Sequence, residues 1–327
     1  MDKSAKPVVC IIAGEVWKSN YVFNLNELPE RCDIYSVGQF AFDRDDCIYV
    51  MEKDESAIKS LTEANKVVYL TIGFVNNDDW WSIFNPSDAN EYKTQKFDPL
   101  VDFLNKYKLS GLFIYFPSLL DSDIQNVFQK ISDFVTSIKE KIDGLKVGIV
   151  FYVTDQISNK TRFDFTLINE IMDHYVIDLS MLNECDDNSK IYGLSPISSE
   201  TMVSIDQVTC VVTNSTVDQS KLFAKIQVSV LIPKDLVGEG VKTVTTYSIY
   251  CGDNDLAKSS KLCGNPSNLS YDQGAYVDKF YSGLYIECLD ADDFECKCGC
   301  KNFPVTNIII DGWEKCDFTA CSKLDQN

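Results

Sequence analysis

Two carboxylates lie within short apolar runs of the sequence, where an ionisable side chain is unusual. Asp178 belongs to the run 175–179, and Glu287 belongs to the run 284–289. If both side chains reach the same end of a barrel of strands, they can act as an acid and a base, because carboxyl groups with shifted pKa values at such a place are catalytic candidates. The competing interpretation is a structural or ligand-binding Glu287, for example one in a salt bridge with a lysine. We favour this second interpretation.

The sequence has a single histidine, His174, immediately before the run 175–179. One histidine excludes zinc sites built from several histidines and leaves at most one Ser-His or Cys-His relay. No nucleophile is indicated as its partner, so we expect His174 to be structural. We expect no metal ion and no cofactor.

Thirteen cysteines are scattered over the chain, and none has the paired CxxC…CxxC spacing of a zinc site. Such a distribution predicts disulfides formed in an oxidising compartment, with at least one cysteine unpaired because the number is odd. The alternative is a cytosolic protein with buried thiols, or a small metal site at Cys296, Cys298 and Cys300.

Three N-glycosylation sequons, which begin at Asn159, Asn214 and Asn268, agree with secretion. The first residues of the chain lack the apolar segment of a signal peptide, and no run approaches the roughly 18 apolar residues of a membrane span. We expect a secreted, extracellular glycoprotein from which a signal peptide has been removed. A cytosolic protein is the alternative.

The composition is that of a folded, acidic protein. Hydrophobic residues make up 45% of the 327 residues, and 49 acidic against 30 basic residues give a formal net charge of -19. This charge repels phosphate backbones and anionic lipid headgroups. We therefore expect no nucleic-acid and no membrane partner, and we predict a monomer that binds a glycan or a protein.

Eight short apolar runs must position these side chains, and they alternate with helical patterns. The runs are 8–13, 34–42, 67–73, 112–116, 147–153, 175–179, 226–232 and 284–289, and the helical patterns are 56–64, 98–107, 124–142, 166–173, 220–224 and 272–281. Buried strands with helical crossovers predict an α/β protein, a closed (β/α)8 TIM barrel in one domain over 1–327. The alternative, an open doubly wound sheet, normally has a glycine-rich turn after its first strand, whereas 13–17 contains one glycine.

The most specific string is GLYIECLDADDF at 283–294, followed by cysteines and by FPVT at 303–306. Together with the strand at 66–74, which ends near Gly73, it resembles the closing strand, DxDDF turn and later FP(L)T of the family 18 glycoside hydrolases, the chitinases and their chitinase-like relatives. The resemblance covers nearly the whole chain and implies the same barrel fold. It also implies that the carboxylates of the turn 290–293 bind backbone amides and cap the next segment, with a calcium site as the alternative.

The resemblance has further implications for disulfides and domain organisation. It implies a disulfide between Cys10 and Cys32, and it pairs Cys251 with Cys296, Cys298 or Cys300. The family often carries an extra α+β domain between its seventh and eighth strands. Here we expect only a truncated, disulfide-linked insertion region at 234–282, and a C-terminal tail at 308–327.

The catalytic strand departs from the family pattern. The family carries DGxDxDxE, in which the Glu protonates the leaving oxygen and the preceding Asp orients the substrate acetamide, which is the nucleophile. The corresponding string here is SGLFIYFP at 110–117, which places Phe113, Tyr115 and Pro117 at the acidic positions. None of these side chains can carry the proton, so the resemblance implies a pseudoenzyme.

Other positions at the expected barrel mouth differ as well. The family's Met-Thr-Tyr-Asp on strand six corresponds to LSML at 179–182, and its strand-eight Trp corresponds to Glu287. We therefore favour a secreted, catalytically inactive factor that binds a glycan or a protein. The alternatives are a chito-oligosaccharide-binding lectin, and a glycosidase with a rebuilt site around Glu287 and Asp178. The ligand-binding candidates at the mouth are Phe40, Trp80, Tyr115, Asp178, Met181 and Glu287.

Overall fold

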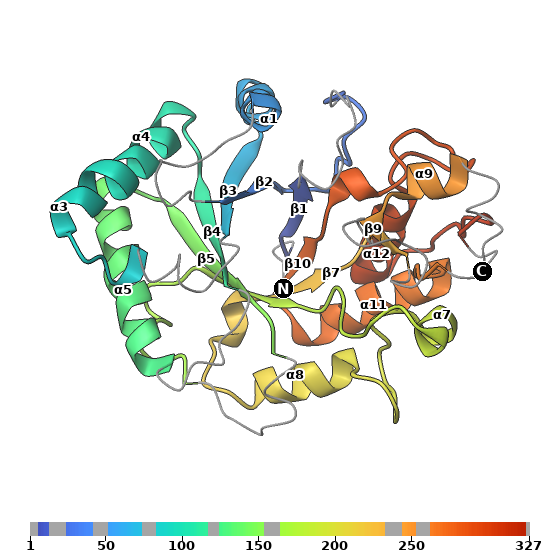
Figure 1. The fold of residues 1–327 in the computed structure, drawn as a ribbon. Helices are drawn as coiled ribbons and strands as arrows, with labels where there is room; N and C mark the ends of the chain where they lie inside the picture. The colour runs from blue at the N-terminus through green and yellow to red at the C-terminus, as the bar shows by residue number, and fades with distance from the viewer. Residues whose placement is uncertain are drawn as a thin grey trace, which may run out of the picture.

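Eight parallel strands close into a barrel with helices around it (Figure 1). The computed structural model describes residues 6–12, 24–41, 52–73, 83–116, 124–153, 164–232, 244–252 and 262–324. The barrel strands are β1 (Val8–Ile12), β2 (Ile34–Ala41), β3 (Val67–Gly73), β4 (Gly111–Phe116), β5 (Lys146–Phe151), β6 (His174–Asp178), β7 (Leu222–Ile226) and β10 (Gly283–Ile286). Because β10 pairs with both β7 and β1, the sheet has no open edge. The predicted (β/α)8 fold is confirmed.

The strands are apolar on both sides because each side is covered. All five residues of β1 are buried. Val8, Cys10 and Ile12 pack in the layer between strands and helices, whereas Val9 and Ile11 pack in the barrel interior. This alternation follows from the two-residue period of a strand, and it explains why the sequence shows continuous apolar runs rather than alternating ones.

The helical layer contains most of the predicted helices. The described helical segments are α1 (Glu52–Glu63), α3 (Ala89–Tyr92), η1 (Lys93–Phe97), α4 (Asp98–Lys106), α5 (Ile124–Lys141), α7 (Asp187–Tyr192), α8 (Ile205–Thr213), η2 (Gln219–Lys221), α9 (Tyr247–Gly252), α11 (Ser267–Phe280), η4 (Leu289–Ala291) and α12 (Pro304–Glu314).

The predicted helix at 166–173 is wrong. That segment forms turns with local hydrogen bonds, such as the one from the Met172 amide to the Ile168 carbonyl, but no continuous helix.

The prediction of a seventh strand at 226–232, preceded by a helix at 220–224, is also wrong. Residues 222–226 form β7, and Val230–Leu231 is β8, which pairs with β9 (Val244–Thr245) in a separate two-stranded sheet. The misleading residue is Lys225, because a lysine interrupts the apolar run on which the prediction relied. Inside the barrel this lysine is paired with carboxylates, which is the condition for burying a charge.

Residues 308–314, expected to begin a tail, form most of α12 instead. Ile308, Ile309, Ile310 and Trp313 are buried, and α12 packs along α11 (Figure 1). The C-terminal segment therefore completes the helical layer. Of the expected insertion 234–282, the described part contains β9, α9 and α11, and α11 is the helix that precedes β10.

Four disulfides connect residues that the structure describes, and one of them starts from strand β1. They are Cys10–Cys32, Cys185–Cys263, Cys251–Cys298 and Cys300–Cys321. Both pairings implied for Cys10 and Cys251 are thus present, the second with Cys298. Among the described residues, the free cysteines are Cys210, Cys288, Cys296 and Cys316. No helix in this part of the chain is both long and apolar enough to cross a membrane.

Candidate functional site

Five neighbouring strands place one inward side chain each at the carboxyl end of the barrel. The barrel interior contains Phe113, Val150, Val176, Phe223 and Tyr285 from β4, β5, β6, β7 and β10. Side chains two positions further along each strand point the same way. We call this next layer the mouth cluster: Tyr115, Tyr152, Asp178, Lys225 and Glu287.

Lys225 lies at the centre of the mouth cluster. Its Nζ is 2.7 Å from Asp178 Oδ2 and 2.9 Å from Glu287 Oε1. All three side chains are buried, with 1%, 0% and 8% of the Lys225, Asp178 and Glu287 side chains exposed. These are charge-assisted hydrogen bonds away from bulk water. They stabilise the fold only while Lys225 keeps its carboxylate partners, because a buried charge without a partner is costly.

Burial and neighbouring charges shift the pKa values of this set. Burial alone lowers the pKa of Lys225, but the Asp178 and Glu287 carboxylates outweigh it and raise that pKa well above its usual value. Burial raises the pKa of Glu287; Lys225 opposes this shift, and the Asp178 charge adds to it. Lys225 therefore holds its proton more tightly than an ordinary lysine, and Glu287 takes up a proton more readily than an ordinary glutamate.

The two carboxylates differ in their remaining hydrogen bonds. Asp178 Oδ1 accepts hydrogen bonds from the backbone amide and the hydroxyl of Ser180, so both Asp178 oxygens have partners. Glu287 Oε2 is buried and has no hydrogen-bond partner. Among the four oxygens of the two carboxylates, Glu287 Oε2 is thus the one without a hydrogen-bond partner.

Two tyrosines complete the mouth cluster. The Tyr115 hydroxyl donates to the Tyr152 hydroxyl at 2.8 Å, and Lys225 Nζ lies 5.4 Å from the centre of the Tyr115 ring. Burial raises the pKa of Tyr115 to about 12, and it raises the pKa of Tyr152 as well. Both phenols are neutral at physiological pH and can donate or accept hydrogen bonds.

β4 presents rings rather than carboxyl groups. Phe113 is fully buried below the mouth, with its ring centre 5.3 Å from that of Tyr69 and 5.1 Å from that of Tyr285. It fills the barrel interior and does not plug the mouth. Tyr115 is half-buried in the layer above, and Pro117 lies outside the described residues.

The other predicted ligand-binding residues do not join this cluster. Met181 packs against Leu194, Leu231 and Cys263, in a separate apolar cluster. The backbone of Phe40 pairs with β3, but its side chain is outside the described part of the structure, as is Trp80.

Two of the three sequons can be placed. Asn214 follows α8 and is exposed, and Asn268 is exposed at the start of α11. The third, Asn159, lies outside the described residues. Both asparagines are thus at the surface, and the side-chain amide of Asn214 donates a hydrogen bond to the Cys210 carbonyl.

The sequence reasoning did not identify Lys225 and Tyr152 as site residues. The signal for Lys225 was the string LFAKI at 222–226, in which a lysine occupies the same side of a strand as Phe223. Tyr152 directly follows β5, where the sequence offers no sign that its hydroxyl meets another phenol.

The acidic turn after β10 is structural, as the resemblance implies. Asp292 accepts hydrogen bonds from the backbone amides of Val305 and Thr306, at the beginning of α12. Asp293 accepts from the amides of Lys297 and Cys298. Among the described residues, no three His, Cys, Asp or Glu side chains are grouped so as to hold a metal ion.

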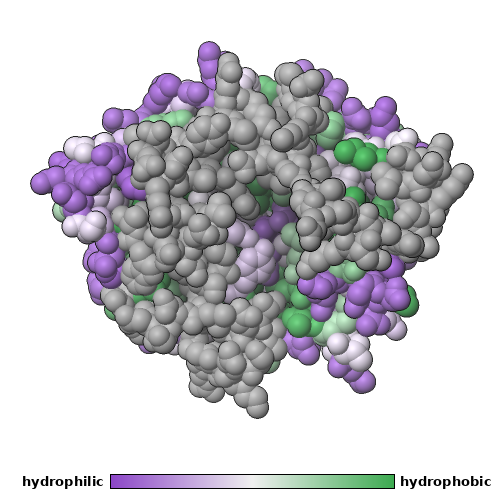
Figure 2. Space-filling view, in the orientation of Figure 1, coloured by the Kyte–Doolittle hydropathy of each residue, from purple (hydrophilic) through white to green (hydrophobic). Residues whose placement is uncertain are grey.

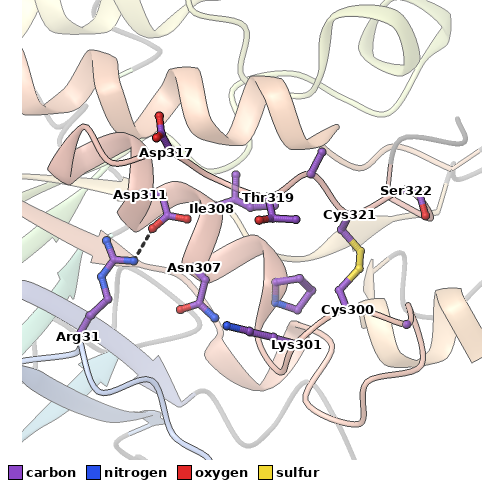
Figure 3. A pocket seen from close by; sticks show the side chains of 13 residues that line it. Arg31, Cys300, Lys301, Asn307, Ile308, Asp311, Asp317, Thr319, Cys321 and Ser322 are labelled. Atoms are coloured by element: carbon purple, nitrogen blue, oxygen red, sulfur yellow. Dashed lines mark hydrogen bonds and ion pairs between the residues drawn. A yellow bond between two sulfur atoms is a disulfide. The ribbon is translucent and has the colours of Figure 1, made fainter.

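The described part of the surface has hollows of different character. Figure 2 shows a hollow near the centre of one face, over the barrel, with hydrophilic residues inside it. A second pocket of about 580 Å³ lies outside the barrel, beside α12. The ion pair of Arg31 with Asp311 lies at one end of this pocket and the Cys300–Cys321 disulfide at the other (Figure 3). Arg31 pairs its two terminal nitrogens with Asp311 and Glu314, while its buried Nε has no partner, and we assign no ligand to this pocket.

The comparisons with known proteins show the fold to be that of family 18 chitinases and chitinase-like proteins. Catalytic domain 2 of the Ostrinia furnacalis Group II chitinase is 13% identical, with a TM-score of 0.74 over 96% of this chain and 97% of that one. Human YKL-39, described as a pseudo-chitinase with retained chitooligosaccharide binding, is 11% identical, with a TM-score of 0.69 over 95% and 100%. The GH18 chitinase from Cycas revoluta, solved with (GlcNAc)3, is 11% identical, with a TM-score of 0.65 over 86% and 93%. No protein-family model and no curated protein sequence matches the chain.

Proposed function

We propose that this protein is a secreted, catalytically inactive chitinase-like protein that binds a glycan at the barrel mouth. The observation that carries the proposal is the position of Lys225, whose ammonium group is held between Asp178 and Glu287. The two carboxylates that could form a rebuilt catalytic pair are thereby joined in one ion cluster.

We expect no hydrolysis because the site lacks a suitable proton donor. Cleavage of a glycosidic bond needs a carboxylic acid within hydrogen-bond reach of the leaving oxygen. In β4 the described inward residues are Phe113 and Tyr115, and both Asp178 oxygens already have partners. Glu287 is the remaining carboxyl group of the cluster, and one of its oxygens is bonded to Lys225.

The mouth cluster has the chemistry of a sugar-binding surface. Sugars bind where aromatic side chains cover their apolar faces and buried polar groups pair with their hydroxyls. Tyr115 and Tyr152 supply rings and hydroxyls, and Glu287 supplies an acceptor without a partner. Chitooligosaccharide binding by the pseudo-chitinase YKL-39, which shares the fold, supports a glycan over other ligands.

Secretion is supported by the cysteines and sequons. Four disulfides are typical of an oxidising compartment, and Asn214 and Asn268 are exposed in their sequons. We therefore include glycosylation and an extracellular location in the proposal, with the protein acting as a monomer.

The test combines a glycan array, calorimetric titration and an assay with labelled oligosaccharides of N-acetylated and deacetylated glucosamine. We expect binding without release of shorter products. Tyr115→Ala should weaken binding roughly tenfold, because it removes a ring and a hydroxyl from the mouth. Tyr192→Ala is the matched control, since Tyr192 is 56% exposed on α7.

Two results would contradict the proposal. Product release that disappears in a Glu287→Gln variant would establish a rebuilt glycosidase instead. If no glycan binds, the partner class is wrong and a protein partner takes its place.

A further inference from the structure

The charges of the mouth cluster do not balance. One ammonium group, Lys225, faces two carboxylates, Asp178 and Glu287. The tyrosines of the cluster are neutral, so the ionised cluster carries one excess negative charge. A buried charge without a full set of partners costs free energy, which a bound cation offsets.

The missing partner is at one atom. Both oxygens of Asp178 accept hydrogen bonds, and Glu287 Oε1 accepts from Lys225, but Glu287 Oε2 has no partner although the residue is only 6% exposed. The terminal torsion of a glutamate turns easily. Oε2 itself is buried, and the exposed 8% belongs to the rest of the Glu287 side chain. A ligand at the mouth therefore reaches the carboxylate when this torsion turns, while Lys225 keeps one of its oxygens.

We propose that the mouth cluster binds the ammonium group of a cationic amino sugar, a glucosamine unit of a deacetylated oligosaccharide, with Glu287 as its counter-ion. This inference rests on the proposed function, because it names the ligand class of the same site. An ammonium group supplies the missing positive charge and several N–H donors, whereas an acetamido group supplies one donor and no charge.

The rest of the cluster suits the remainder of such a sugar. Tyr115 donates its hydroxyl hydrogen to Tyr152, which leaves the Tyr152 hydroxyl hydrogen for another acceptor. The ring of Tyr115 already lies near one ammonium group, that of Lys225, and an aromatic face also attracts a second cation. The net charge of -19 adds a long-range attraction for cationic oligosaccharides that salt screens.

The experiment is a calorimetric titration at moderate salt with two oligosaccharides of matched length, one of glucosamine and one of N-acetylglucosamine. We expect the glucosamine oligomer to bind at least about tenfold more tightly, as a charge-assisted hydrogen bond implies. Glu287→Gln should remove this preference, because it keeps the shape of the side chain and removes its charge. Asp143→Asn should keep it, since Asp143 is exposed between α5 and β5, at the amino ends of the strands.

The outcomes separate this inference from the proposed function. If the acetylated oligomer binds equally well or better, the inference is wrong and the proposed function stands. If the preference persists in Glu287→Gln, the general acidic surface binds the amine and the inference is again wrong. If neither oligomer binds and the glycan array is also negative, the proposed function itself fails. Should Glu287→Gln unfold, a folded Glu287→Asp variant tests the same assignment, because it keeps the charge but draws it back by one methylene group. The preference should then fall, and an unchanged preference would contradict Glu287 as the counter-ion.

Discussion

At the scale of single residues, the buried Lys225 and its two carboxylates depend on one another. Removing Lys225 leaves two carboxylates inside the barrel without a cation, and such a loss is more costly than the net contribution of the intact set. Asp178 is fully buried and Glu287 nearly so. The cluster therefore fixes the identity of three residues on three neighbouring strands, β6, β7 and β10.

Lys225→Met should lower the free energy of unfolding by about 3–5 kcal/mol at neutral pH, because Asp178 and Glu287 then share the barrel mouth without a cation. Urea denaturation measures the change. Lys279→Met is the control, since Lys279 is exposed on α11, and it should change stability by less than about 0.5 kcal/mol. An unchanged unfolding midpoint for Lys225→Met would show that the carboxylates do not depend on Lys225.

His174 is a half-buried ionisable group at the opposite end of the barrel. Its ring centre lies 4.8 Å from that of Phe223 and 5.9 Å from that of Phe113, and its buried Nε2 has no hydrogen-bond partner. Burial is the main cause that lowers the pKa of His174 from 6.5 to about 4; the Asp173 charge opposes it. The histidine is thus a neutral member of an aromatic cluster, as expected of a structural residue.

The lowered pKa of His174 predicts a loss of stability in acid. Below about pH 6.5 the unfolded chain binds a proton at this residue and the folded protein does not, so stability is fully present above pH 6.5 and declines as the pH falls towards 4. Between about pH 7 and pH 4.5 the wild type should lose about 2 kcal/mol more than His174→Phe. Urea denaturation of both proteins at both pH values measures this difference. The contributions of the other titrating groups cancel, because they are the same in the two proteins. Equal losses in the two proteins would contradict a depressed pKa.

At the scale of elements, the contact between α11 and α12 depends on two glycines. A Cβ atom at Gly274 of α11 would lie 2.0 Å from the Ile309 carbonyl oxygen, and one at Gly312 of α12 would lie 2.0 Å from the Tyr271 carbonyl oxygen. The backbones of the two helices therefore meet directly. This close approach places α12 against the barrel, and α12 begins at the amides that Asp292 caps.

Gly274→Ala should destabilise the protein despite the higher helix propensity of alanine. The added methyl group forces the two helices apart, which we expect to cost about 2–3 kcal/mol. Thermal or urea unfolding measures the effect. Asp272→Ala, at an exposed position of the same helix, should leave stability within about 0.5 kcal/mol of the wild type. A neutral or stabilising Gly274→Ala would mean that the helices do not approach so closely.

At the scale of the whole molecule, disulfides join segments that the barrel strands leave separate. Cys185–Cys263 spans 78 residues and links the segment before α7 to the segment before α11. Cys300–Cys321 spans 21 residues beside α12. Cross-links over longer segments restrict the unfolded chain more.

Replacing both members of a disulfide by serine should therefore cost more for Cys185–Cys263 than for Cys300–Cys321. In the chain-entropy model the losses are about 4 and about 3 kcal/mol. Urea unfolding without reductant compares the two double variants with the wild type. The reverse order would show that local packing, rather than restriction of the unfolded chain, dominates.

Features that depend on neighbouring residues in the sequence were predicted correctly, whereas features that depend on contacts between distant segments were not. The runs that became β1 and β3 were visible because these strands are mostly apolar and buried. The run in β6 was visible through Tyr175, Val176 and Ile177, although the strand ends in Asp178. The seventh strand was misplaced because Lys225 makes β7 look amphipathic. A lysine can lie in a buried strand only if other strands supply carboxylate partners for it. A local sequence pattern does not show whether such partners are present.

The sequence by itself determined the barrel class, the abundance of cysteine and the absence of acids on β4, because these properties depend on residue types and short-range periodicity. Only the tertiary structure decided which charges meet. Lys225 lies 47 residues after Asp178, and β7 stands between β6 and β10 only once the barrel closes. That closure turns two carboxylates that looked like an acid and a base into the partners of one ammonium group.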